Sequence, residues 1–255
     1  MRTQRYFMLL ILMLLMVSGC AAQADDRRNV ITISAAASMK DSLEEIQEEF
    51  YNVHPDISLV FNYGSSGALK RQIEQGAPVD AFLSASKKHF VDLLEEEYIF
   101  TTNKNAFASN AIVMVTHKNS EFNRLNELLQ NGKRIALAIP ETTPAGKYAQ
   151  EALENMGAWE SMQSRIVFGK DVRHVLTLVE QQSVDGGLVY QSDAVSSQKV
   201  KVIKKLDASL YSPIGYYAGV VKKSENRAQA ELFTEFLHQK ISQDILVANG
   251  FLYPK

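Results

Sequence analysis

Short runs rich in β-branched residues alternate with amphipathic stretches along most of this 255-residue chain. The runs 30–33, 57–61 and 134–139 are predicted strands. The stretches 39–51 and 145–156 carry apolar residues at helical spacing and are predicted helices. Such alternation is typical of an α/β fold, in which helices flank mixed, mainly parallel sheets.

The length of the chain favours two lobes, since a domain usually takes about 100 to 150 residues. The segments 107–110 and 211–214 are candidate crossings between them. With both as crossings, residues 29–108 and 216–255 together form one lobe, and residues 109–215 form the other. We then expect a ligand cleft between the two lobes.

The amino-terminal segment is a predicted export signal. Two arginines precede an apolar run over 6–17, which is shorter than the about 20 residues that a membrane-spanning helix needs. Its ending, Val-Ser-Gly-Cys, resembles the lipobox of bacterial lipoproteins. We expect residues 1–19 to be cleaved, a lipid at Cys20 to hold the protein on the outer face of the cytoplasmic membrane, and 20–28 to be a tether. An ordinary cleaved leader with an incidental cysteine is the alternative.

Composition excludes several classes of function. A single cysteine allows neither an intramolecular disulfide nor a thiolate metal cluster. The net charge of −2 gives no excess of positive charge for nucleic acid. The five histidines are scattered, and no carboxylate cluster has metal-ligand spacing, so we expect no bound metal cation and no cofactor.

Small and hydroxyl residues stand where predicted strands lead into helices. Ser38 and Ser66 follow the first two strands as predicted helix N-caps. The backbone amides of Ala145 and Val172 fall in the first turns of two later helices, where amides lack intrahelical partners. Because the carboxyl ends of parallel strands meet at one sheet edge, we expect these groups to face a common cleft.

Such donors indicate the chemistry of the ligand. Helix N-termini attract anions, and amides and hydroxyls donate best to an anion that carries no proton. A hydrogen bond to a charged group contributes about 1.5–3 kcal/mol. Five to seven of them could offset desolvation and leave about −8 kcal/mol, a micromolar Kd. A fully ionised tetrahedral dianion is therefore the predicted ligand.

At these residues the chain resembles the molybdate-binding proteins of bacterial ABC importers. The resemblance covers nearly all of the mature chain and implies a two-lobed type II periplasmic-binding-protein fold. It also implies that molybdate, and tungstate with it, is held by Ser38, Ser66, the Ala145 and Val172 amides and the Tyr190 hydroxyl. The stretches that carry the resemblance are Ala-Ala-Ala-Ser (35–38), Ser-Ser (65–66), Leu-Lys-Arg-Gln-Ile (69–73), Gly-Ala-Pro-Val-Asp (76–80), Pro-Ala-Gly (144–146), Tyr-Ala (148–149), Asp-Val-Arg (171–173), Gly-Leu-Val-Tyr (187–190) and Ser-Asp-Ala (192–194).

The resemblance further implies a monomeric, non-enzymatic protein that delivers its ligand to a membrane permease. One departure is that Gly64 and Gly67 flank the two serines, where the family pattern leads us to expect a longer serine/threonine run. A receptor for sulfate or another oxyanion on the same fold is the nearest alternative. A serine hydrolase is disfavoured because this Gly-Ser-Ser-Gly segment lacks the Gly-x-Ser-x-Gly spacing.

Overall fold

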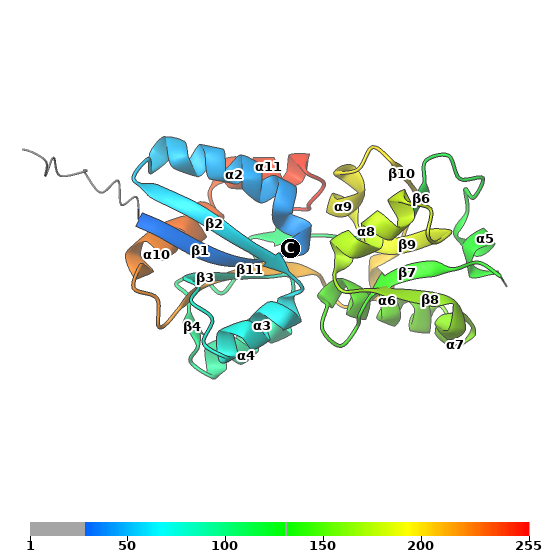
Figure 1. The fold of residues 1–255 in the computed structure, drawn as a ribbon, viewed down its shortest axis with the longest axis horizontal. Coiled ribbons are helices and arrows are strands. Elements are labelled where there is room, and N and C mark those ends of the chain that lie inside the picture. The colour runs from blue at the N-terminus through cyan, green and yellow to red at the C-terminus, as the bar shows by residue number, and fades with distance from the viewer. Residues whose placement is uncertain (1–28, 131, 255) are drawn as a thin grey trace, which may run out of the picture.

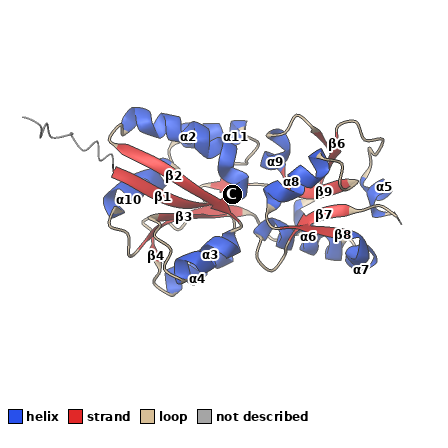
Figure 2. Cartoon of the chain, viewed as in Figure 1, coloured by secondary structure: helices blue, strands red, loops and turns tan. Residues whose placement is uncertain are grey.

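The computed structural model describes residues 29–130 and 132–254, which form two lobes side by side (Figure 1). Each lobe contains one sheet with helices on both sides (Figure 2). The sheet of lobe 1 is built from β1 (Asn29–Ala36), β2 (Ile57–Gly64), β3 (Ala81–Ser84), β4 (Ile99–Phe100), β5 (Ala108–Ser109) and β11 (Gly215–Val221). The sheet of lobe 2 is built from β6 (Ile112–His117), β7 (Ile135–Ala138), β8 (Ile166–Gly169), β9 (Gly186–Tyr190) and β10 (Val200–Lys205).

In lobe 1 the strand order is β2-β1-β3-β11-β4, with β5 also paired to β11. Strand β1 lies between β2 and β3 and runs parallel to both, so the carboxyl ends of these three strands lie at one edge. The helical elements of this lobe are η1 (Ala37–Met39), α2 (Lys40–Val53), α3 (Ser66–Glu74), α4 (Lys87–Glu95), α10 (Arg227–Phe236) and α11 (Lys240–Ala248).

In lobe 2 the order is β10-β6-β9-β7-β8, and β7 runs parallel to β8 and β9. The lysine-rich strand β10 lies at the edge, as its alternating charged and aliphatic residues predict. The helical elements of this lobe are α5 (Leu125–Leu129), α6 (Pro144–Asn155), α7 (Trp159–Met162), η2 (Gln163–Arg165), α8 (Val172–Glu180), α9 (Gln191–Val195) and η3 (Ala208–Leu210).

The α/β fold and its two lobes are confirmed, and the structure refines the expected strand directions. Both sheets are mixed, and the antiparallel pairings involve β6 and β11, the strands next to the crossings. The strands that lead into the candidate site are the parallel ones.

Burial of apolar side chains holds the helices on the lobe 1 sheet. On one face, Leu43, Ile46 and Phe50 of α2 belong to a large buried cluster that also includes Phe233 of α10. On the other face, α3 and α4 contribute to a smaller cluster around Phe82 of β3. Fully burying one such side chain stabilises the fold by about 1.5–3 kcal/mol. The helix N-termini are thereby held firmly at the sheet edge.

The two lobes are joined where β5 leads into β6 and where the chain enters β11 (Figure 1). Within the described residues, no helix is long and apolar enough to cross a membrane. The predicted leader, tether and lipidated Cys20 lie outside the described residues.

Candidate functional site

The helix N-termini of the two lobes meet around one small cavity. Its free volume is about 10 Å³, close to that of a single water-sized sphere, so the lobes lie close together around it. All five residues predicted from the sequence line it. The full lining is Ala36, Ala37, Ser38, Gly64, Ser65, Ser66, Ala85, Thr143, Pro144, Ala145, Asp171, Val172 and Tyr190.

Lobe 1 contributes two buried serine hydroxyls, and each is held by a neighbour. The Ser66 Oγ accepts a hydrogen bond from the Ala85 backbone N–H at 3.0 Å. The Ser38 Oγ lies 2.9 Å from the Tyr216 hydroxyl oxygen. Because the Ser66 oxygen is already an acceptor, its own proton is available for a ligand in the cavity.

The predicted helix-capping roles of these two serines are wrong. Ser38 lies in the short helix η1, and α2 begins without a side-chain cap. Ser65 caps α3 by accepting from the Ala68 N–H, and Ser66 is the first residue of that helix. Shifts of one residue at a helix end are common, since several local arrangements satisfy the first amides. Here the shift leaves the Ser38 and Ser66 hydroxyls unused by the helices.

Lobe 2 contributes backbone amides. Pro144 is the first residue of α6, as predicted, so the Ala145 amide lies in the first turn. Asp171 caps α8 by accepting from the His174 N–H at 2.8 Å, and Val172 is the first helical residue. Neither the Ala145 nor the Val172 N–H donates to another group among the described residues. Both helix N-termini bring a partial positive charge to the cavity wall.

Tyr190, at the end of β9, adds a hydroxyl from the same lobe. The residue is buried, and its hydroxyl oxygen lacks a hydrogen-bond partner among the described residues. A buried polar group without a partner costs about 1–3 kcal/mol. Burial, and then the nearby Tyr216, raises the pKa of Tyr190 well above its ordinary value, so the hydroxyl keeps its proton. It is therefore a donor without an acceptor.

The lobes also touch directly beside the cavity. The Gly67 N–H of α3 donates to the Thr142 carbonyl of lobe 2 at 3.0 Å. A Cβ atom at position 67 would lie 2.5 Å from that oxygen, which is too close for a real contact. Glycine at this position therefore permits the approach of the lobes. From the sequence, Gly67 is a departure from the serine/threonine run and a residue that allows close approach of the backbone, but its partner in the other lobe is not predicted.

Arg173, next to Val172, forms a second contact between the lobes. Its guanidinium bonds to the Asp41 carboxylate and, at 3.3 Å, to the Ala37 carbonyl, both in lobe 1. Its Nε also lies 3.1 Å from an oxygen of the fully buried Asp193 of lobe 2. Burial raises the pKa of Asp193 to about 7, and Arg173 opposes that shift. The motif Asp-Val-Arg thus supplies a helix cap, a cavity amide and an interlobe ion pair.

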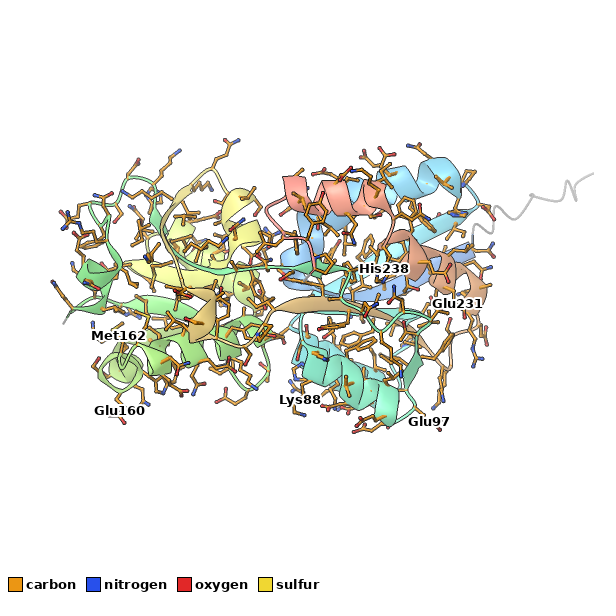
Figure 3. The ribbon with its side chains drawn as sticks, turned by 180° about the vertical axis from the view of Figure 1, so that it is seen from behind. Lys88, Glu97, Glu160, Met162, Glu231 and His238 are labelled. Carbon is orange, nitrogen blue, oxygen red and sulfur yellow. The ribbon has the colours of Figure 1, made fainter. Side chains whose placement is uncertain are left out.

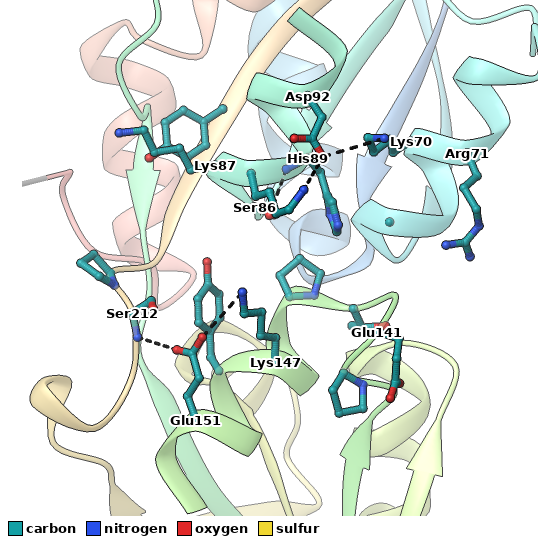
Figure 4. A pocket seen from close by; sticks show the side chains of 18 residues that line it. Lys70, Arg71, Ser86, Lys87, His89, Asp92, Glu141, Lys147, Glu151 and Ser212 are labelled. Atoms are coloured by element: carbon teal, nitrogen blue, oxygen red, sulfur yellow. Dashed lines mark hydrogen bonds and ion pairs between the residues drawn. The ribbon is translucent and has the colours of Figure 1, made fainter. Parts of the chain in front are cut away.

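A much larger groove, of about 800 Å³, lies between α3 and α4 of lobe 1 and α6 of lobe 2 (Figure 4). Lys88 marks the end of α4 that faces lobe 2, and Glu97 lies beyond the opposite end (Figure 3). The groove meets the small cavity at Thr143 and Pro144. Three of its lysines form ion pairs with neighbouring carboxylates: Lys70 with Glu74, Lys88 with Asp92 and Lys147 with Glu151. Because the carboxylates of Asp92, Glu141 and Glu151 line the groove together with its cations, the groove is a weaker candidate for an anion site than the small cavity.

Among residues 29–130 and 132–254, no three His, Cys, Asp or Glu side chains are grouped to hold a metal ion. The small cavity is lined instead by uncharged donors, with Asp171 as the charged exception. Such a set suits an anion whose oxygens all accept hydrogen bonds.

Comparisons with known proteins agree with this geometry. The family model described as bacterial extracellular solute-binding protein matches residues 31–252. A Bacillus subtilis protein assigned as an ABC transporter substrate-binding lipoprotein, YvgL, is 38% identical over 254 residues, which cover 96% of each chain. The molybdate-binding protein ModA of Haemophilus influenzae is 34% identical over 87% of this chain and 89% of its own.

A solved structure also matches. It is assigned as the substrate-binding domain of a molybdenum ABC transporter from Clostridium difficile and has a TM-score of 0.69 at 38% identity, over 89% of this chain and 99% of its own. These matches confirm the resemblance predicted from the motifs. The chain belongs to the bacterial extracellular solute-binding proteins, in the same family as the ModA molybdate-binding proteins.

Proposed function

We propose that this protein captures molybdate outside the cytoplasmic membrane and delivers it to an ABC importer. The ligand contacts are the hydroxyls of Ser38, Ser66 and Tyr190 and the amides of Ala145 and Val172. The observation that carries the proposal is the buried Tyr190 hydroxyl, which has no partner among the described residues and lines the same cavity as the Ser38 and Ser66 hydroxyls. The relatedness to ModA proteins supports molybdate as the ligand.

Closure of the lobes around the ligand follows because the proposed hydrogen-bond donors come from both lobes. Two of the five contacts come from lobe 1 and three from lobe 2, so only a closed form satisfies the ligand completely. The small free volume means that the lobes must part to admit an oxyanion. We assign residues 29–108 and 216–255 to lobe 1 and residues 109–215 to lobe 2, with hinges at the crossings.

Tungstate is included in the proposal because it has the charge and tetrahedral shape of molybdate. Sulfate is smaller, since its bonds to oxygen are shorter, and we expect the cavity to discriminate by size.

Lipid attachment at Cys20 is also part of the proposal. It is supported by the lipobox-like ending of the leader and by the assignment of the relative YvgL as a lipoprotein.

Calorimetric titration of the mature protein with molybdate, tungstate, sulfate and phosphate tests the function. We expect molybdate and tungstate to bind with a Kd of about 1 μM or lower, which corresponds to about −8 kcal/mol. Sulfate and phosphate should bind at least about 100-fold more weakly. Comparable heats from sulfate would favour the alternative that the protein is a sulfate receptor. No heat from any of the four oxyanions would refute the proposed function.

A further inference from the structure

A chain of three buried polar side chains leads from an interlobe crossing to the cavity. Asn110 lies between β5 and β6, in the first crossing, and Tyr216 is the second residue of β11. The Asn110 Nδ2 lies 3.2 Å from the Tyr216 hydroxyl oxygen, which in turn lies 2.9 Å from the Ser38 Oγ. Tyr216 is not part of the cavity wall, whereas Ser38 is.

The orientation of the Asn110 amide fixes the direction of the first hydrogen bond. Its Oδ1 accepts from the Ala111 backbone N–H at 2.9 Å, and its Nδ2 donates to the Ser192 hydroxyl at 2.8 Å. An amide nitrogen can only donate, so the Tyr216 oxygen must accept from Asn110. In the reversed orientation, the Asn110 NH2 group would face the Ala111 N–H, so two donors would meet without an acceptor.

The direction of the second bond follows from the first. The Tyr216 hydroxyl is fully buried, and Ser38 is the only partner able to accept its proton among the described residues. Since a buried hydroxyl proton needs an acceptor, Tyr216 donates to Ser38. The Ser38 oxygen is thereby an acceptor from Tyr216, and its own proton is directed toward the cavity.

From this geometry we propose that Tyr216 and Asn110 are positioning residues that fix Ser38 as a hydrogen-bond donor to the oxyanion. The site thereby selects anions without a proton over those that carry one. This inference rests on the proposed function and deepens it. The Ala85 N–H holds Ser66 in the same sense, so both serines of lobe 1 present protons to the ligand. A protonated anion such as hydrogen phosphate would place its own proton against one of these donors.

The variant Tyr216→Phe tests the proposal because it removes only the hydroxyl. Its ring contacts with Phe107, Tyr190 and Phe251 are retained. We expect molybdate to bind about 10-fold more weakly, since the Ser38 hydroxyl then loses its fixed orientation. The affinity for hydrogen phosphate, measured at about pH 8, should not fall. The Kd for phosphate divided by the Kd for molybdate should therefore fall by a similar factor. An unchanged ratio would overturn the proposal.

A double-mutant cycle separates positioning from general damage to the fold. In a Ser38→Ala background, Tyr216→Phe should weaken molybdate binding no further, because its effect passes through Ser38. Additive losses would contradict the proposal. The matched control is Tyr211→Phe at the second crossing, where the hydroxyl accepts from the Ile112 N–H and does not touch Ser38. This control should keep the molybdate-to-phosphate ratio of the original protein.

Neutron diffraction of the unmodified protein with bound molybdate makes the test independent of any variant. After exchange into heavy water, the deuteron on the Tyr216 oxygen should point to Ser38 and that on Ser38 to the ligand. A Ser38 deuteron pointing to Tyr216 would refute the inference and leave the proposed function intact. Absence of molybdate binding by the unmodified protein would refute both.

Discussion

The two lobes contribute different kinds of donor to the same cavity. Lobe 1 presents side-chain hydroxyls, and the oxygens of Ser38 and Ser66 are each held by a partner in the same lobe. Lobe 2 presents the Ala145 and Val172 amides and the Tyr190 hydroxyl, none of which has an acceptor among the described residues. For the proposed ligand, lobe 1 would therefore be arranged in advance, and lobe 2 would gain most when an acceptor arrives. This difference suggests that the ligand docks on lobe 1 and that lobe 2 closes over it.

Removal of both lobe 1 hydroxyls is expected to have the largest effect. In the double variant Ser38→Ala, Ser66→Ala, two charge-assisted bonds are lost, about 3–6 kcal/mol together, which corresponds to about 10²–10⁴ in Kd. Calorimetry with molybdate measures the loss. The control is Ser42→Ala, a buried serine that bonds to the Met39 carbonyl and does not line the cavity. Retained affinity in the double variant would place the site elsewhere.

Deletion of one lobe 2 donor is expected to have the next largest effect. Val172→Pro removes a single backbone N–H at the first position of α8, where proline fits a helix. The extended conformation of Asp171 suits a following proline. Molybdate should bind about 10- to 100-fold more weakly. The control Val172→Ala keeps the backbone N–H and loses side-chain packing much as Val172→Pro does. It should lower the thermal stability with little change in the Kd for molybdate. Equal losses of affinity in the two variants would contradict the role of the amide.

Closure can be weakened without touching any proposed ligand contact. Gly67→Ala places a methyl group 2.5 Å from the Thr142 carbonyl oxygen of the other lobe and 3.1 Å from the His89 ring of lobe 1, and parting of the lobes relieves the closer of these two contacts. We expect molybdate affinity to fall about 10-fold, in line with an overpacking cost of about 1–3 kcal/mol. Small-angle scattering with saturating ligand should show a larger radius of gyration. The melting temperature of the ligand-free variant should be unchanged, and a lowered one would indicate a clash within lobe 1 instead.

The Arg173 contact between the lobes is expected to have the smallest effect. Asp41→Asn removes the lobe 1 carboxylate and leaves the pairing of Arg173 with buried Asp193 in place. Because the Asp41 side chain is 39% exposed, solvent weakens the ion pair to about 0.2–1 kcal/mol. Molybdate should dissociate up to about 5-fold faster in stopped-flow measurements, and the difference should shrink in high salt. A salt-independent change would argue against an ionic contact.

The sequence predicted the fold, and the five residues that it singled out line one cavity, because both depend on local signals. Serine and proline at strand–helix junctions mark where helices begin, and parallel strands bring those junctions to one edge. Asp171 and Pro144 were correctly placed in this way. The capping roles of Ser38 and Ser66 were wrong by a single residue or turn, since helix ends are the least determined feature of a sequence.

The remaining features depend on contacts between distant parts of the chain. Ser38 and Tyr216 are 178 positions apart, and nothing local at either residue signals their hydrogen bond. The role of Gly67 depends on a carbonyl of the other lobe, so the glycine is explained only once the lobes are placed. The interlobe reach of Arg173 depends on the same placement.

The described chain enters lobe 1 at Asn29, the start of β1, at the end of that lobe farthest from lobe 2 (Figure 1). A lipid anchor upstream of Asn29 would hold lobe 1 near the bilayer as the stationary lobe. Lobe 2 would then be the moving lobe, covalently linked to lobe 1 through the two crossings. A transporter that recognises the ligand-bound form would then contact lobe 2, whose orientation relative to the membrane changes on closure. Anchoring the protein through lobe 2 instead would reduce that change in orientation.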